Sequence, residues 1–219
     1  MSSMVNGDSP EEEPMTASLL LASLHPAELD LLRRDDLTVD DIVNLPEDLH
    51  YELIDGRLVL TPLALPTHQL IGIETATAIK EHSPDEFIIN VEQAILIDRR
   101  NELRPDVVLI HEEGAGYSPV LPGDVPLVVE IISKSSQRTD RDLKLKKYAY
   151  VGIPSYWIID PLAERVTFTE FRLGPDGAYQ SRLQADDIVT VDWPWEITLD
   201  LPAWTRRRDR TNRVARRDR

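Results

Sequence analysis

The segment Pro126–Ser136, PLVVEIISKSS, places one carboxylate inside an otherwise apolar, β-branched run. Leucine, valine and isoleucine flank Glu130 on both sides, which is the pattern of a strand with two buried faces. A carboxylate without a partner in such a strand would cost several kcal/mol of folding free energy. Glu130 therefore requires a partner, which is either a buried Lys or Arg or a bound metal ion.

The segments around this run predict a single folded domain of the α/β class. Its central elements are expected in the order helix, three strands, helix and strand, over residues 66–83, 86–98, 104–111, 126–133, 137–152 and 155–160. A hairpin with Asp55 and Gly56 at its turn is expected before them. This order favours a mixed central sheet flanked by helices, an arrangement also described as α+β.

Composition narrows the class of protein further. The chain of 219 residues contains no cysteine, which excludes disulfides and thiolate metal sites and favours a cytoplasmic location. No apolar run approaches the roughly 18 residues that span a membrane, so no membrane partner is expected. The net charge of −15 argues against indiscriminate binding to nucleic acid.

The charge is distributed unevenly along the chain. The last 14 residues contain eight Arg and two Asp and carry +6, so the first 205 residues carry −21 within a chain of −15. Two interpretations of this basic C-terminal tail stay open. It is either a disordered, solvated end or an arm that contacts phosphates.

Two carboxylates are associated with neighbouring strands. Asp106 directly precedes one apolar strand, and Glu130 lies inside the next. The loop between them allows the strands to lie side by side, which would bring both acids to one edge of the sheet. Adjacent carboxylates repel each other, and a divalent cation removes that repulsion. Mg²⁺ is often held by one or two carboxylates, where it can activate water and polarise a phosphodiester.

A lysine near this pair would complete a site for phosphodiester hydrolysis, because it could orient the water or offset charge in the transition state. The helix that follows Glu130 offers Lys144, Lys146 and Lys147. Lys144 lies four residues after Asp140 and shares a helical face with it. Lys146 and Lys147 are expected to face solvent.

Five segments occur in an order that resembles a known family, namely YELIDGRLV, PTHQ, RPDVVLI, LVVEIISKSSQRTDRDLKLKKYA and GIPSYWIIDP. Together they resemble the Uma-type restriction endonuclease family, within the PD-(D/E)XK nuclease superfamily, from about Thr38 to Trp204. The resemblance implies an αβββαβ core of the restriction-endonuclease type. It also implies that Asp106 and Glu130 are metal ligands.

The sequence departs from the superfamily pattern at one position. Ile132 stands two residues after the glutamate, where the superfamily motif has lysine. The family pattern is Glu-x-x-Ser, followed by a lysine on the next helix in a DR-x-x-K-x-x-x-Y run. That run is present as DRDLKLKKY, and the resemblance assigns the lysine role to Lys144.

Three further residues fall within the matching segments. Glu52, in YELIDG, is expected either to be an additional metal ligand or a base, or to face solvent from the hairpin. His68, in PTHQ, is expected either to bind phosphate of the substrate or to order the site, or else to cap the start of a helix. Tyr148 is most simply a core aromatic residue.

These inferences combine into a prediction of function. The chain is expected to be an endonuclease that uses Mg²⁺ or Mn²⁺ to hydrolyse phosphodiester bonds of a DNA substrate. The catalytic residues would be Asp106, Glu130, Lys144 and Glu52, with Asp106, Glu130 and Glu52 as metal ligands and His68 contacting the substrate. A homodimer would cut both strands of a duplex.

The predicted organisation has three parts. Residues 1–37 form a disordered or partly helical extension, residues 38–204 form the PD-(D/E)XK endonuclease-like domain, and residues 205–219 form the basic tail. The alternative function is a catalytically inactive module that keeps the fold and binds or regulates a partner. The acidic body favours this alternative, whereas the joint presence of the paired carboxylates and the lysine favours the enzyme.

Overall fold

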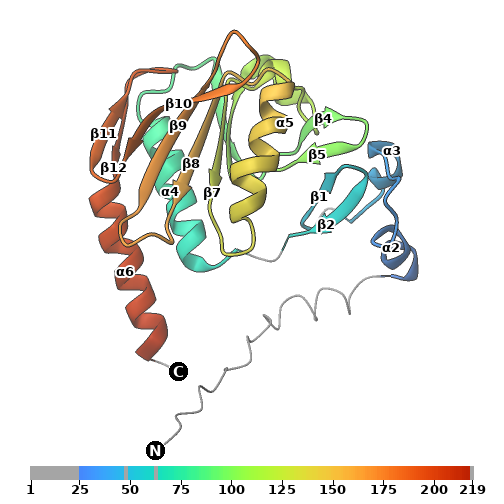
Figure 1. The fold of residues 1–219 in the computed structure, drawn as a ribbon, viewed down its shortest axis with the longest axis horizontal. Coiled ribbons are helices and arrows are strands. Elements are labelled where there is room, and N and C mark those ends of the chain that lie inside the picture. The colour runs from blue at the N-terminus through green and yellow to red at the C-terminus, as the bar shows by residue number, and fades with distance from the viewer. Residues whose placement is uncertain (1–24, 47–48, 62–63, 218–219) are drawn as a thin grey trace, which may run out of the picture.

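The computed structural model describes residues 25–46, 49–61 and 64–217 (Figure 1). Its helical segments are α2 (Pro26–Leu31), α3 (Val39–Ile42), α4 (Pro66–Lys80), η1 (Glu112–Gly116), η2 (Pro122–Asp124), η3 (Thr139–Lys144), α5 (Leu145–Tyr150) and α6 (Leu201–Arg217). Its strands are β1 (Tyr51–Ile54), β2 (Arg57–Leu60), β3 (Phe87–Val91), β4 (Ile95–Asp98), β5 (Asn101–Leu103), β6 (Val107–His111), β7 (Leu127–Ile131), β8 (Ser155–Asp160), β9 (Thr167–Leu173), β10 (Tyr179–Ala185), β11 (Ile188–Val191) and β12 (Ile197–Asp200). None of the helices in these ranges is long and apolar enough to cross a membrane.

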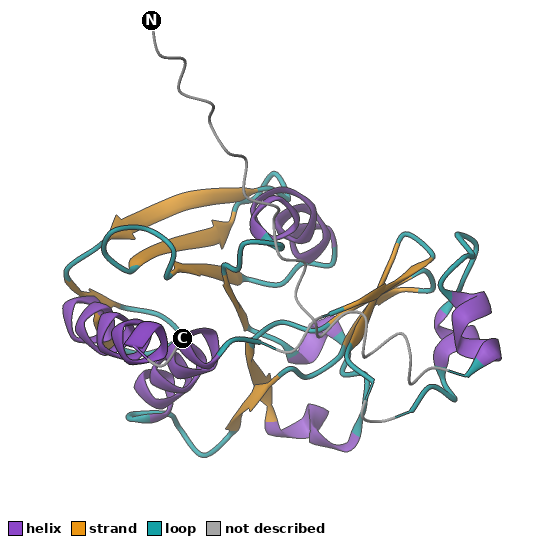
Figure 2. Cartoon of the chain, turned by 90° about the horizontal axis from the view of Figure 1, so that it is seen from below, coloured by secondary structure: helices purple, strands orange, loops and turns teal. Residues whose placement is uncertain are grey.

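A six-stranded mixed sheet forms the centre of the molecule. Its order is β10-β9-β8-β7-β6-β3, in which β7 and β8 are parallel and the other neighbours are antiparallel. Helices α4 and α6 cover one side of the sheet and α5 covers the other (Figure 2). The predicted α/β class and the succession of helix, three strands, helix and strand are confirmed, with α4, β3, β6, β7, α5 and β8 as those elements.

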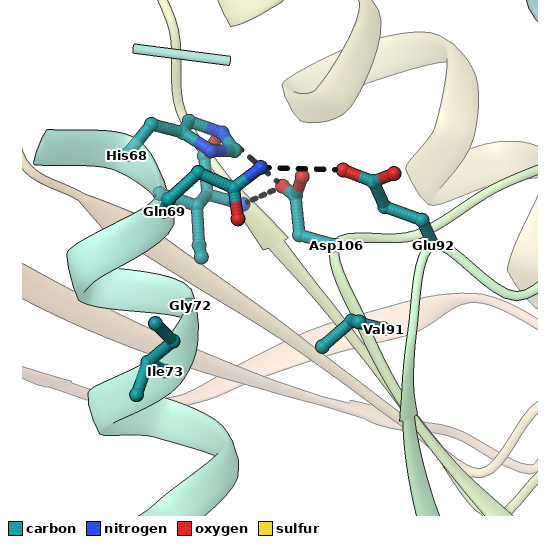
Figure 3. A pocket seen from close by; sticks show the side chains of 8 residues that line it. His68, Gln69, Gly72, Ile73, Val91, Glu92 and Asp106 are labelled. Atoms are coloured by element: carbon teal, nitrogen blue, oxygen red, sulfur yellow. Dashed lines mark hydrogen bonds and ion pairs between the residues drawn. The ribbon is translucent and has the colours of Figure 1, made fainter. Parts of the chain in front are cut away.

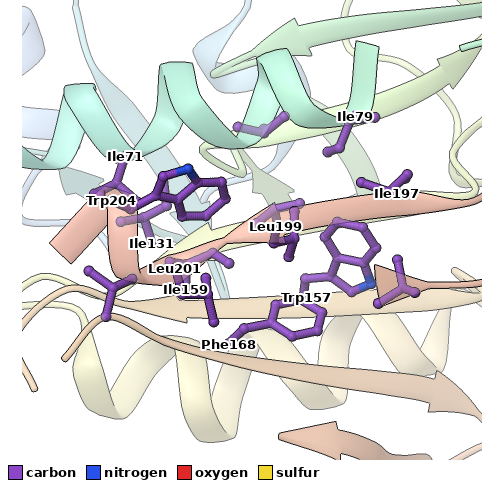
Figure 4. Close-up of a cluster of buried hydrophobic side chains, with 14 of the residues drawn as sticks. Ile71, Ile79, Ile131, Trp157, Ile159, Phe168, Ile197, Leu199, Leu201 and Trp204 are labelled. Atoms are coloured by element: carbon purple, nitrogen blue, oxygen red, sulfur yellow. The ribbon is translucent and has the colours of Figure 1, made fainter. Parts of the chain in front are cut away.

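Strand β7 separates two hydrophobic clusters because its side chains alternate between the two faces of the sheet. Val129 and Ile131 pack with residues of α4 and α6 (Figure 4). Val128 and Ile132 pack on the other face, beneath α5. Glu130 falls between these two residues in the alternation and therefore faces α5.

A four-stranded sheet, β2-β1-β5-β4, stands beside the central sheet and carries Glu52 on β1. A separate cluster of buried side chains, which includes Leu37 and Leu53, packs there together with Leu31 and Leu32. Helix α2 and Leu37 therefore contact the domain, although both were expected to belong to an extension. The remainder of the predicted extension, residues 1–24, lies outside the described residues.

The segment 86–98, expected to be one strand, is divided into two. Strand β3 pairs with β6 in the central sheet, whereas β4 pairs with β5 in the four-stranded sheet. The division occurs at Glu92, whose φ of 52° lies in the left-handed region. A non-glycine residue there ends the extended conformation and redirects the chain.

The basic C-terminal segment is helical as far as residue 217, so the first of its two interpretations, a disordered end, is wrong for residues 205–217. Trp204 is buried in the cluster beneath α4, and Arg207 forms an ion pair with Glu74 of α4. Arg208 is also buried, and its guanidinium donates to the carbonyls of Pro161, Ala163 and Glu164 at 2.7, 2.7 and 2.8 Å. These contacts hold the start of α6 against the loop that follows β8.

We expect Arg208→Gln to lower the free energy of unfolding by about 3 kcal/mol, because it removes several charge-assisted hydrogen bonds and leaves loop carbonyls without donors. Urea denaturation followed by tryptophan fluorescence measures this loss. Arg206→Gln, on the exposed side of the same helix, should change stability by no more than about 0.5 kcal/mol. Equal effects of the two substitutions would contradict the anchoring role.

Candidate active site

Glu130 is held on the α5 side of β7 by two donors. Its side chain is almost completely buried, with 2% of the residue exposed. Its Oε1 atom accepts hydrogen bonds from Lys144 Nζ at 3.0 Å and from the Tyr148 hydroxyl at 2.8 Å. Of the two kinds of partner expected for Glu130, the structure shows the buried lysine. Tyr148 was expected to be a core aromatic residue only, and its hydroxyl contact is a site feature that the sequence analysis missed.

Lys144 brings its ammonium group into contact with several carboxylates. Its Nζ lies 2.9 Å from Glu52 Oε1, 3.0 Å from Glu130 Oε1 and 3.6 Å from Asp140 Oδ1. Lys144 ends η3, a turn of π-helix that leads directly into α5. Such wide turns are frequent at functional sites, because they change which side chains share a face.

Glu52 connects the four-stranded sheet to this cluster. Besides the lysine, its Oε1 accepts a hydrogen bond from the backbone amide of Arg104 at 2.9 Å. Only 8% of Glu52 is exposed, so the alternative that it faces solvent is wrong. The predicted solvent exposure of Lys146 is correct, whereas Lys147 donates to Asp55 at 2.6 Å.

Asp106 lies at the end of β6 nearest to Glu130, because Val107 is the register partner of Val129. Its Oδ2 accepts a hydrogen bond from the backbone amide of Ile131 at 2.6 Å and lies 3.5 Å from His68 Nε2 (Figure 3). His68 comes from the first turn of α4, and the same Nε2 lies 2.9 Å from the Ile131 carbonyl. His68 makes no capping contact at the start of α4, so the capping alternative is wrong.

A pocket opens beside Asp106 between the start of α4 and the end of β3 (Figure 3). Its lining consists of His68, Gln69, Gly72, Ile73, Val91, Glu92, Asp106 and Ile131. On the solvent side, Gln69 donates to Glu92 at 3.5 Å. The pocket therefore gives Asp106 and His68 access to a ligand, whereas Glu130 and Lys144 are buried and do not line it.

Asp140 is a further buried carboxylate, which the sequence analysis named only as a neighbour of Lys144 on the same helical face. It is 1% exposed, and neither of its carboxylate oxygens has a hydrogen-bond partner among the described residues. Lys144 Nζ, at 3.6 Å, is the nearby cation. The spacing of four residues between Asp140 and Lys144 was the signal in the sequence that could have identified it.

The electrostatics of the cluster reflect an excess of carboxylates over cations. Burial raises the pKa of Glu130 well above its usual value, and the nearby carboxylates add to this rise against the opposing effect of Lys144. Burial likewise raises the pKa of Asp106, to about 6, and the pKa of Asp140. Burial alone would lower the pKa of Lys144, but the surrounding carboxylates outweigh it and raise the pKa well above its usual value.

A divalent metal ion would have to be held by the carboxylates of this cluster. Within the described ranges, no three His, Asp or Glu side chains are already arranged as ligands of one ion. The donors nevertheless fit a hard cation, because all are carboxylate oxygens, the preferred ligands of Mg²⁺. The raised pKa values and the oxygens of Asp140 without hydrogen bonds indicate that further positive charge would be stabilised here.

Removal of the ammonium group is expected to destabilise the fold. Lys144→Met would leave buried carboxylates without their cation, at a cost of about 3–5 kcal/mol in the free energy of unfolding. The double variant Lys144→Met with Glu130→Gln should lose less unfolding free energy than the sum of the two single losses, by about 1–3 kcal/mol. Urea denaturation of the three variants measures this coupling. Lys146→Met is the exposed control, and strictly additive losses would contradict the ion pair.

The raised pKa of Asp106 predicts a pH dependence of stability. The folded protein binds this proton more tightly than the unfolded chain, so the contribution to stability is complete below about pH 4 and is lost as pH rises through about 6. Asp106→Asn should flatten this part of the curve of unfolding free energy against pH. Asp85→Asn, an exposed control, should keep the wild-type slope. Equal slopes for wild type and Asp106→Asn would contradict the assignment.

Comparisons with known proteins identify the family and support the fold. The sequence model of the family described as "Uma2: Putative restriction endonuclease" matches residues 39–207. A solved structure, that of a putative nuclease belonging to DUF820 from Anabaena variabilis ATCC 29413, has a TM-score of 0.60 and 16% sequence identity. The similarity covers 78% of this chain and 98% of that chain and supports the fold. A search of curated proteins found no match. Because the family model spans most of the chain, the protein belongs to the Uma2 family of putative restriction endonucleases.

Proposed function

We propose that the protein is an endonuclease that hydrolyses DNA phosphodiester bonds with Mg²⁺ or Mn²⁺. The observation that carries the proposal is the contact of buried Lys144 with the carboxylates of Glu130 and Glu52. Asp106, which lines the pocket, belongs to the same group of interacting charges. Membership of a family of putative restriction endonucleases supports the same class of reaction. A homodimer, with one site for each strand of a duplex, is part of the proposal.

In this proposal, Asp106, Glu130 and Glu52 would hold the metal ion. A bound Mg²⁺ or Mn²⁺ supplies a Lewis acid for the phosphodiester and lowers the pKa of a bound water. The carboxylates would contribute oxygen ligands from neighbouring elements, and burial is the main cause that raises the pKa values of Asp106 and Glu130. Their pKa values should fall when a cation binds, so they would be ionised at neutral pH.

Lys144 would act as a hydrogen-bond donor and a fixed positive charge. Its raised pKa keeps Nζ protonated at neutral pH, which makes it unsuitable as a general base. An ammonium group at this point can orient the attacking water and stabilise negative charge that develops on the phosphate. Tyr148 and Asp140 would limit the positions available to Nζ and to the Glu130 carboxylate.

His68 would contribute to substrate binding at the mouth of the site. It lines the pocket from the first turn of α4, where backbone amides and the helix dipole favour an anion. Its Nε2 contacts the Ile131 carbonyl and Asp106, so it also restricts the Asp106 side chain. A phosphate that enters the pocket would therefore meet His68 before it reaches the buried carboxylates.

The inactive binding or regulatory module is the second candidate, and one observation favours it. Lys144 and Tyr148 already satisfy one oxygen of Glu130 without a metal ion. A closed network of this kind is sufficient to explain a carboxylate in an apolar strand. Activity and metal binding therefore have to be measured together.

Nicking of supercoiled plasmid DNA tests the enzyme. With Mg²⁺ or Mn²⁺, Glu130→Gln should lower the rate at least about 100-fold relative to wild type, because it removes a charged ligand from the site. Glu86→Gln, which changes an exposed glutamate, is the matched control and should retain the wild-type rate.

The outcomes separate the two candidate functions. Nicking that is independent of metal and equal in wild type and Glu130→Gln would reject the proposed mechanism. Absence of nicking, together with no heat of Mn²⁺ binding by calorimetry, would favour the inactive module. Mn²⁺ binding that is lost in Glu130→Gln would support the metal site independently of activity.

A further inference from the structure

Helix α6 presents a row of arginines that takes no part in holding the fold together. Arg206, Arg210 and Arg213 are exposed and follow one another at intervals of four and three residues. At 3.6 residues per turn, this spacing places all three on one side of the helix. None of them has a hydrogen bond or ion pair with another side chain in the part of the chain that the structure describes. These three residues are called the basic stripe below.

The basic stripe lies opposite the side of α6 that packs on the domain. The packed side carries Leu201, Trp204 and Arg208, all of which are buried. The helix is held by these residues and by the ion pair between Arg207 and Glu74. Among the described residues, the stripe therefore makes no stabilising contact that would explain three adjacent positive charges, which repel one another.

The basic stripe stands at the same edge of the central sheet as the candidate active site. Arg208 binds the carbonyls of residues that directly follow β8. Strand β8 is parallel to β7, and Glu130 is the penultimate residue of β7, so both strands end at this edge. From there α6 runs past the sheet, and its C-terminal half stands clear of it (Figure 1). Lys134 and Arg138, in the segment after β7, are also exposed at this edge.

We infer that the basic stripe is a docking surface for the sugar–phosphate backbone of duplex DNA. The inference rests on the proposed function and concerns how the substrate is held. Arginine is suited to this contact because its planar guanidinium binds phosphate through two hydrogen bonds. The stripe extends over about 10 Å of helix, which corresponds to about three successive phosphates of one strand.

Charge distribution explains why such a surface is required. The first 205 residues carry −21 and repel a polyanion, and the carboxylates of the site add to this repulsion. A local row of positive charge beside the site would offset the repulsion where the duplex has to approach. Contacts to phosphates position the DNA without reading its sequence. The stripe would therefore raise affinity for all duplexes to a similar extent.

The test measures binding of the full-length protein to a fluorescently labelled duplex of mixed sequence, by anisotropy, with Ca²⁺ in place of Mg²⁺. The triple variant Arg206→Gln, Arg210→Gln and Arg213→Gln should bind at least about 10-fold more weakly than wild type. The slope of log K against log salt concentration should become shallower by about 3, one unit for each lost phosphate contact. Circular dichroism and thermal unfolding should match wild type, because all three side chains are exposed.

The matched control removes the same charge from other surfaces. Arg99, Arg165 and Arg182 are exposed and already paired with Asp40, Asp186 and Asp192. Their joint replacement by Gln should leave the salt slope unchanged. An equal loss in both triple variants, an unchanged slope in the stripe variant, or no binding by wild type would each overturn the inference.

Two further measurements distinguish duplex DNA from other polyanions and the docking surface from the hydrolytic site. Stripe-dependent binding to anionic lipid vesicles or to poly-glutamate that exceeds binding to the duplex would assign the surface to another polyanion and overturn the inference. Plasmid nicking is measured independently. If a stripe variant still nicks plasmid and binds DNA as wild type does, the docking surface is rejected and the nuclease proposal is kept. If wild type binds DNA through the stripe but does not nick plasmid, the nuclease proposal is rejected and the docking surface is kept.

Discussion

The contact between one ammonium group and several buried carboxylates is the interaction on which the site depends. Lys144 reaches Glu52 on the four-stranded sheet, Glu130 on the central sheet and Asp140 at the start of its own helical segment. Each of these carboxylates is buried and would be costly without a cation. The ion cluster therefore connects β1 of the four-stranded sheet, β7 of the central sheet and the helical segment that carries Lys144.

The same edge of the sheet combines opposite electrostatic environments. Asp106 lines the pocket together with His68, Glu130 is buried, and burial raises the pKa values of both carboxylates. The arginines of α6 that take no part in packing lie on the outer side of a helix anchored at that edge. In the proposed function, a phosphodiester backbone would use both features, since its charge suits the arginines and its hydrolysis suits a metal held by carboxylates.

Several expectations from the sequence correspond to the structure because they depended on local patterns. Continuous apolar, β-branched runs located the core strands, and the charge inside PLVVEIIS correctly indicated a buried carboxylate with a partner. Other expectations failed where long-range contacts decide the outcome. Composition suggested a disordered end for residues 205–217, but buried contacts of Trp204 and Arg208 with distant segments order this helix. Likewise, a single left-handed residue, Glu92, divides an apolar segment between two sheets.

By itself, the sequence determined the class of fold, the order of its core elements and the requirement that Glu130 be neutralised, because these follow from periodicity along the chain and from the cost of burying charge. Tertiary structure decided which groups meet. The contact of Lys144 with Glu52 joins residues that are far apart in the chain, and the burial of the Asp140 carboxylate depends on how the elements around η3 pack. Such contacts depend on the relative placement of whole elements, to within the length of a hydrogen bond, and no local pattern of residues encodes that placement.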